Sequence, residues 1–289
     1  MKITNLTTLE EVTFGNIFLL STIDWGVVPA SHNKTKGFGQ IGSTINSTAL
    51  NTRTVRVVGF IKLDGKEGME RYKAMLSSLI NPLHVLQFEY NDRSIRGKPT
   101  STIIPAQERR DNRKYLYKFS FSCECEYPMF SFVQDLRKDV ALWLGGFFFP
   151  LQIDETEGIE FSIRSQSQIE VFENEGEVPV GMIVRFRATG SVQNPSLRDI
   201  DTQEFITIDR TMIAGDEIII NTNFDRIAAT LLRGGVETNI INNVRLGSNY
   251  SLSLRQGSTV LWYGADTNEE FLEVSIEYSP AFFMPYKGG

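Results

Sequence analysis

The sequence of 289 residues predicts a mainly β fold in two domains, with one α-helix and an extended arm in the first domain and a β-sandwich in the second. Three observations support this. Short β-branched runs separated by turn signals fill residues 178–222. Apolar side chains recur at helical spacing in one stretch, 69–80. The length exceeds that of one average core, and the charge is divided unevenly along the chain.

The charge division indicates where the two domains meet. Residues 1–138 hold 19 Lys and Arg against 13 Asp and Glu, whereas residues 139–289 hold 10 against 22, so the net charges are +6 and −12. Halves this different are not expected to share one core, and we predict domains at 1–138 and 139–289. The acidic second half would repel phosphate, which disfavours nucleic-acid binding there.

A long polar passage from residue 24 to residue 51 interrupts the first half. Loops of this length are uncommon unless they are disordered or functional. The passage predicts a flexible arm or hairpin that reaches a neighbouring subunit. The predicted oligomer interface consists of its few apolar residues, Trp25, Val27, Val28, Phe38 and Ile41.

The remainder of the first half predicts three strands and one helix. The strands are 54–63, 84–90 and 115–127, and residues 91–97 read as a charged turn. The helix is expected from Asp64, with Glu67 at the capping-box spacing, to about Ile80. Core packing is the expected role of its apolar stripe, Met69, Tyr72, Leu76, Leu79 and Ile80.

The chain's two cysteines lie on the strand 115–127, where apolar and polar residues alternate. The alternation places Cys123 and Cys125 on the buried face, as free thiols. Two cysteines exclude a disulfide scaffold. With His32 and His84 distant in sequence, the ligands of a zinc site are also missing, and we expect neither metal nor cofactor.

Strand after strand is predicted in the second half, which indicates a β-sandwich. The runs are 158–163, 168–172, 181–188, 204–208, 216–222, 229–232, 251–254, 259–264 and 271–278. Trp262 lies in VLWYG, which is apolar on both alternating faces, so its side chain is expected to be buried.

This half resembles the C-terminal domain of the distal tail protein (Dit) family of phages with long, non-contractile tails. The motifs are Glu177–Gly181, Phe186–Gly190, Asn194-Pro195, Gly215–Thr222, Asn243, Ser251–Gly257, Trp262-Tyr263 and Tyr278–Pro280. The sequence departs from the family's pattern at Gln203 and Ser258, which leaves the subfamily open.

The resemblance implies a virion structural protein of a siphovirus or prophage, with a galectin-like C-terminal sandwich and a ring-forming N-terminal domain. Six copies would form a hub that joins the tail tube protein to the tail tip, or tail-associated, protein of the baseplate, and DNA would pass through the ring without sequence-specific binding. A receptor-binding protein is a further expected partner. The hub would be assembled in the cytoplasm of the bacterial host and would reside in the virion tail.

Several alternatives are disfavoured. A galectin-like sandwich could instead be a carbohydrate-binding module. Gly37–Gly42 spells G-x-G-x-x-G, but its flanks predict neither the strand nor the helix of a dinucleotide site. The basic cluster 108–114 reads as a solvated hairpin tip, and the acidic clusters 154–157 and 173–177 as solvated turns, so we expect no enzyme. The longest apolar run, 140–151, is too short for a membrane anchor.

Overall fold

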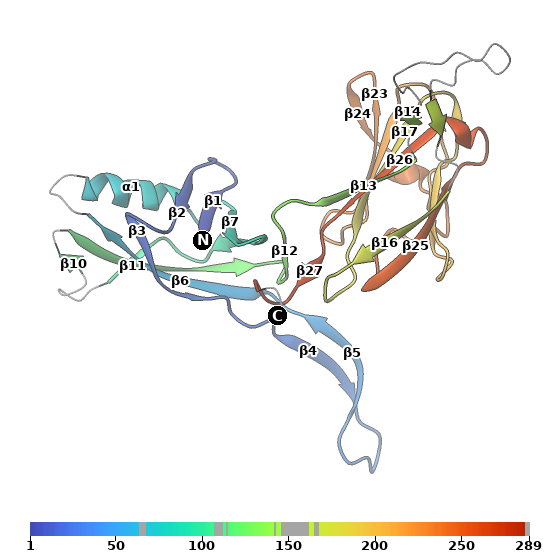
Figure 1. Cartoon of the computed structure of the whole chain (residues 1–289). Coiled ribbons are helices and arrows are strands. Elements are labelled where there is room, and N and C mark those ends of the chain that lie inside the picture. The colour runs from blue at the N-terminus through green and yellow to red at the C-terminus, as the bar shows by residue number, and fades with distance from the viewer. Residues whose placement is uncertain are drawn as a thin grey trace. The chain divides into compact units, whose positions relative to one another are not determined.

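The computed structural model describes residues 1–63, 68–106, 112–113, 115–141, 143–145, 162–164 and 168–286. The chain forms two compact units. Unit 1 comprises Met1–Val133 and the C-terminal segment from Phe282, and unit 2 comprises Gln134–Ala281. The predicted fold class is confirmed, because strands dominate both units and unit 1 holds the one α-helix of the described residues (Figure 1).

Unit 1 is built on an antiparallel sheet with the order β2-β1-β7-β8-β11-β6-β3. Its strands are β1 (Lys2–Asn5), β2 (Glu11–Thr13), β3 (Phe18–Asp24), β6 (Arg53–Lys62), β7 (Leu86–Tyr90), β8 (Arg93–Pro99) and β11 (Leu116–Cys125). Short strands extend it, namely β9 (Ile104–Pro105), β10 (Asn112–Arg113), β12 (Phe130–Phe132) and β27 (Ala281–Phe282). The predicted strands 54–63, 84–90 and 115–127 therefore exist as β6, β7 and β11.

Strand β11 confirms the predicted alternation. Its inward face carries Phe119, Phe121, Cys123 and Cys125, all buried, whereas Glu124 between the cysteines is exposed. Both thiols are free. Burial raises the pKa of Cys125 to about 12 and that of Cys123 further, so both stay protonated and act as small apolar side chains.

The helix α1 (Met69–Leu79) begins four residues later than predicted with Asp64 as its cap. Gly68 precedes it with φ 106° and offers no side-chain cap, while the predicted capping pair, Asp64 and Glu67, lies outside the described residues. The apolar stripe does pack on the sheet. Leu76, Leu79 and Ile80 are buried in the unit 1 core, and Met69 and Tyr72 lie half-buried against it.

The predicted turn at 91–97 was wrong in extent. Only Asn91 and Asp92 form the turn, and β8 begins at Arg93. Asn91 has φ 56°, a left-handed conformation that Asn tolerates. The charged residues that follow suggested a solvated loop, but Arg93, Ser94 and Ile95 are all buried, and the exposed residues of β8 are Arg96 and Lys98.

Unit 2 is the predicted β-sandwich. One sheet has the order β13-β26-β17-β22-β23-β24 and the other β16-β25-β19-β20. The first contains β13 (Leu136–Ala141), β17 (Met182–Ala188), β22 (Glu217–Asn221), β23 (Ala228–Arg233), β24 (Val236–Asn239) and β26 (Leu272–Tyr278). The second contains β16 (Ile169–Asn174), β19 (Ser196–Asp199), β20 (Phe205–Thr207) and β25 (Gly257–Gly264). Phe172 of β16 meets Tyr278 of β26 edge-on at 6.0 Å between ring centres, which joins the two sheets.

Smaller elements complete unit 2. They are β14 (Trp143–Gly145), β15 (Ser162–Arg164), β18 (Val192–Gln193), β21 (Thr211–Met212) and the 3-10 turns Ile241–Asn243 and Glu269–Phe271. The strand predicted at 251–254 is absent. Only Leu254 bridges to Val180, because the Asn249 side chain turns the chain by accepting a hydrogen bond from the Ser251 N–H at 2.8 Å. Most of the run predicted at 158–163 lies outside the described residues.

Candidate assembly arm and its anchor

The polar passage predicted as an arm is a hairpin. Its strands, β4 (Ala30–Thr35) and β5 (Thr44–Leu50), pair with each other in a two-stranded sheet of their own, and every residue in them is exposed. Figure 1 shows the hairpin projecting from the body of unit 1. An isolated two-stranded hairpin is marginally stable in water. Contact with a partner surface would therefore stabilise this arm.

The arm tip is apolar and fully exposed. The Gly37–Gly42 loop closes the hairpin, with the Gly37 N–H donating to Gln40 Oε1 at 2.8 Å. Phe38 and Ile41 in this loop are as exposed as in an extended chain, at 111% and 101%. Strand β5 follows the loop, where a dinucleotide site would need a helix N-terminus.

The arm joins unit 1 at its root, which consists of the connection from β3 to β4 and the connection from β5 to β6. Trp25 holds the first of these two connections. Its ring is buried and meets Tyr90 and Phe130 edge-on, at 5.7 and 5.3 Å between ring centres. Gly26 follows with φ 68°, and a Cβ there would lie 2.2 Å from the Thr54 carbonyl oxygen, so only glycine fits.

The five predicted interface residues therefore divide into two groups. Trp25 packs inside unit 1 and anchors the arm, and Val28 is half-buried. Val27 is 76% exposed, and with Phe38 and Ile41 it is available to a partner.

The second half of the root is held by Arg53, whose side chain is buried. Its Nη2 donates to the Phe283 carbonyl oxygen at 2.6 Å, and its guanidinium lies 4.9 Å from the centre of the Phe130 ring. Nε and Nη1 find no partner among the described residues. Burial lowers the pKa of Arg53, because the surroundings solvate its charge poorly.

Arg93 fastens the same C-terminal segment. Its Nη1 donates to the carbonyl oxygens of Met284 and Tyr286 at 2.6 and 2.7 Å, and its guanidinium lies 3.5 Å from the centre of the Phe282 ring. Tyr286 in turn meets Tyr90 edge-on at 6.2 Å. The segment Phe282–Tyr286, here called the C-terminal strap, is therefore bound beside the arm's root. One feature of the sequence could have identified both arginines. Each lies on a strand at a position that faces the interior.

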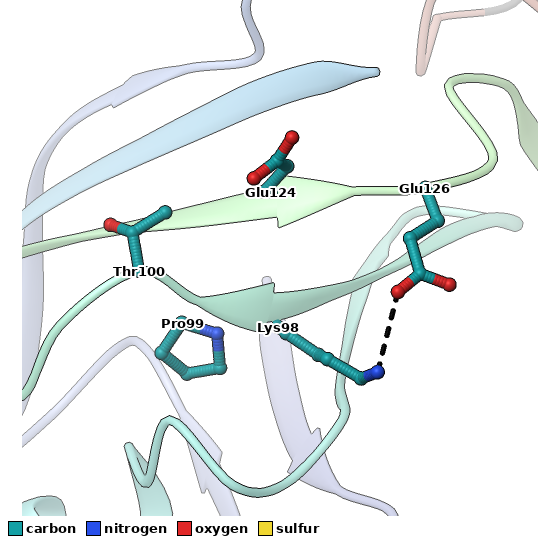
Figure 2. Close-up of a pocket in the computed structure, with 5 residues that line it drawn as sticks. All are labelled: Lys98, Pro99, Thr100, Glu124 and Glu126. Atoms are coloured by element: carbon teal, nitrogen blue, oxygen red, sulfur yellow. Dashed lines mark hydrogen bonds and ion pairs between the residues drawn. The ribbon is translucent and has the colours of Figure 1, made fainter.

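A shallow pocket of about 250 Å³ opens beside the root, where β8 pairs with β11 (Figure 2). Its lining is Lys98, Pro99, Thr100, Glu124 and Glu126. Lys98 pairs with Glu126 at 3.3 Å, and Glu124 accepts a hydrogen bond from Thr52 at 2.8 Å. Lys98 and Glu126 therefore neutralise each other, and Glu124 is held by a hydroxyl group. Within the described part of the chain, no three His, Cys, Asp or Glu side chains gather as metal ligands.

In unit 2 the predicted burial of Trp262 was wrong. Leu261 and Tyr263 are buried, but Trp262 is half-buried, because alternation along β25 turns it to the outer face. Its Nε1 donates to Gln168 Oε1 at 3.1 Å, and its ring lies against the backbone of Gly264, where a Cβ would come within 2.3 Å. The Arg198 guanidinium stands 6.0 Å from the ring centre.

No helix in the described residues is long and apolar enough to cross a membrane. Among curated proteins, no sequence matches the chain. The informative matches are to a family and to solved structures.

Residues 175–282 match the family described as siphovirus-type tail component, C-terminal domain. This span covers most of unit 2, so the sandwich is similar in sequence to a class of phage tail components.

The resemblance to the distal tail protein family is confirmed by this sequence match, and the fold of the chain agrees with it. The fold is similar to that of Dit from phage SPP1, described as a paradigm of the hub adsorption apparatus of phages that infect Gram-positive bacteria. The TM-score is 0.66 at 14% identity, with 97% of this chain and 98% of that chain covered. A chain of the phage P2 baseplate in its activated conformation is also similar, with a TM-score of 0.52 at 10% identity and coverage of 96% and 97%.

Proposed function

We propose that this protein is a structural distal tail protein, which forms a hexameric hub between the tail tube and the tail tip or baseplate of a phage or prophage virion. Unit 1 builds the ring, DNA passes through its centre, and unit 2 faces the neighbouring tail proteins. Assembly takes place in the cytoplasm of the bacterial host. The role is non-enzymatic.

The observation that carries the proposal is the arm. It displays an aromatic and an aliphatic side chain at full exposure, and an unpartnered arm of this kind is expected to bury them against another copy. A head-to-tail contact of one arm with the next copy closes into a ring only when its rotation divides a full turn. The similarity to the hub protein of SPP1 supports the ring, and the family resemblance supplies six as the number.

Native mass spectrometry of the purified protein tests the proposal, at concentrations up to those used for crystals. We expect a hexamer for the intact chain. The partners of the arm strands guide the variant, because Asn33 stands opposite Ser47. Replacing Lys34–Asn46 by Asn-Gly closes the shortened hairpin with a two-residue turn. This variant should remain folded and lose the ring. A monomeric intact protein, or a variant that still forms hexamers, contradicts the proposal.

Carbohydrate binding is a second candidate function, favoured by one observation. The Trp262 ring is half-buried on the outer face of the sandwich and is held by its hydrogen bond to Gln168. Fixed aromatic rings with polar neighbours such as Arg198 and Gln168 suit stacking on a sugar. Isothermal titration of the protein with a panel of bacterial cell-wall saccharides tests it, with Trp262→Ala as the control. Heat that persists in the control excludes this site.

A further inference from the structure

The most exposed leucines in the body of unit 1 lie on two neighbouring turns. Leu9 is 76% exposed and Leu6 is 37% exposed on the turn between β1 and β2, and Leu83 is 86% exposed on the loop between α1 and β7. The Leu6 N–H donates to the Val85 carbonyl oxygen at 2.9 Å, which ties the two turns together. We call Leu6, Leu9 and Leu83 the leucine patch.

A buried polar network holds the patch rigid. Asn5 is fully buried, and its Oδ1 accepts hydrogen bonds from the N–H groups of Thr7 and Thr8 at 2.9 and 3.1 Å. Its Nδ2 donates to the Leu79 carbonyl oxygen at 2.9 Å and to His84 Nδ1 at 3.0 Å. One asparagine therefore shapes the first turn and binds it to the helix end and to the second turn.

The backbone of this turn is held by hydrogen bonds between its two ends. Leu9 has φ 60°, a left-handed conformation that is uncommon for a residue with a bulky side chain. Its N–H donates to the Asn5 carbonyl oxygen at 2.8 Å, and the Asn5 N–H donates to the Glu10 carbonyl oxygen at 2.8 Å. The turn therefore keeps a mostly exposed leucine in a fixed place, which suits a docking site.

The patch and the arm lie at opposite edges of the sheet. Strands β2 and β1 form one edge, whereas β3, from which the arm leaves, forms the other edge beside β6. A head-to-tail ring needs two different surfaces that complement each other. The arm tip and the leucine patch meet this need, since both present exposed apolar side chains.

Charge agrees with the same pairing. Between residues 27 and 52 the arm carries Lys34 and Lys36 and no acidic residue. Glu10 follows Leu9 directly in the turn between β1 and β2, and Glu11 begins β2, where it also pairs with Lys2 at 2.7 Å. Opposite charges around an apolar contact favour the correct partner and orientation.

We infer that the leucine patch is the receptor for the arm tip, Phe38 and Ile41, of a second copy of this chain. The inference rests on the proposed ring and specifies its contact. Phe38 is the aromatic anchor, and the three leucines are the surface that removes it from water.

Disulfide trapping tests the contact directly. The native thiols Cys123 and Cys125 are buried and do not interfere. In Phe38→Cys/Leu83→Cys, mild oxidation should produce a ladder of covalent oligomers, whereas either single variant should give at most dimers. Phe38→Cys/Ile104→Cys is the matched control, because Ile104 is 55% exposed on β9, away from the patch. A ladder in the control and none in the test variant overturns the inference.

A second measurement separates this inference from the proposed function. Leu9→Asn tolerates the left-handed conformation, so Leu9→Asn/Leu83→Ser should fold and should weaken assembly at least tenfold. Ile104→Ser should leave assembly unchanged. If the arm-shortened protein loses the ring while Leu9→Asn/Leu83→Ser keeps it, the arm docks elsewhere, and only the inference fails. If the intact protein forms no ring, the proposed function fails and the inference with it.

Discussion

Arginine plays different parts in the two units. In unit 1, Arg53 and Arg93 are buried, and backbone carbonyl oxygens of the C-terminal strap accept their hydrogen bonds. In unit 2, the arginines that pair with carboxylates stay at the surface, as Arg233 does with Asp216. Burying a charge is expensive unless it is fully hydrogen-bonded, so unit 1 depends on its strap in a way that unit 2 does not.

The largest effect is expected from a truncation that ends the chain after Ala281 and so removes the C-terminal strap. Both guanidinium groups then lose their acceptors, and Phe282 no longer packs on Phe132, from which its ring centre is 5.4 Å distant. We expect unit 1 to lose about 3–5 kcal/mol of unfolding free energy.

Urea unfolding, followed by the fluorescence of buried Trp25 in proteins that also carry Trp143→Phe and Trp262→Phe, measures this loss. A fragment of residues 134–281 is the companion experiment and should give a dispersed amide spectrum by itself. A molten fragment, or full stability after truncation, would show that the two units do not differ in this respect.

The next largest effect is expected from Arg93→Ala, which removes two hydrogen bonds to the strap and the contact with Phe282. The loss should be about 2–3 kcal/mol, together with faster proteolysis of the C-terminus. Lys should not substitute well, because it lacks the planar fork. Arg96→Ala is the control, since Arg96 is exposed on the same strand. Equal losses at the two positions would refute a special role for Arg93.

In unit 2, Asp216→Asn should cost about 1–2 kcal/mol near pH 7. Arg233 Nε donates to Asp216 Oδ1 at 2.8 Å, and this guanidinium holds the pKa of the buried Asp216 carboxyl below its ordinary value of 3.8. The stabilisation is therefore complete above pH 3.8 and is lost as the pH falls through the lowered pKa. Unfolding curves between pH 2 and pH 7 measure it. Parallel pH profiles for the variant and the parent protein would exclude the pair as the cause.

The smallest effect is expected at Arg187, whose guanidinium lies 3.7 Å from Glu273 and is 69% exposed. Exposed pairs contribute about 0–1 kcal/mol. Arg187→Ala should change the unfolding free energy of unit 2 by less than about 0.5 kcal/mol. A loss as large as that of Asp216→Asn would mean that surface pairing also supports this unit.

The pattern of apolar and polar residues along the sequence predicted those parts of the fold that depend on neighbouring residues alone. The alternation of β11 located both cysteines, and the polar passage located the arm. Trp25 was assigned to the arm's interface, but its ring lies inside unit 1, because the partners that bury it, Tyr90 and Phe130, are distant in sequence. The sequence did not predict the C-terminal strap for the same reason, because Arg53 and its acceptor are 230 residues apart.

The candidate docking site shows a second limit. Exposed leucines are ordinary on protein surfaces, and nothing in the sequence marks Leu9 as left-handed or Asn5 as buried. Only the backbone conformation and the hydrogen bonds of Asn5 reveal that the turn is held in place. The periodicity of the sequence cannot predict side-chain hydrogen bonds between turns, because these bonds depend on tertiary contacts.

The C-terminal strap has a mechanical consequence. The chain leaves unit 1 after Val133 and returns to it at Phe282, so unit 2 is tethered by two chain passages. A pulling force on unit 2 is divided between them, so each passage bears less than the whole tension. The returning passage ends at the buried arginines beside the arm's root, so that tension arrives at the base of the arm.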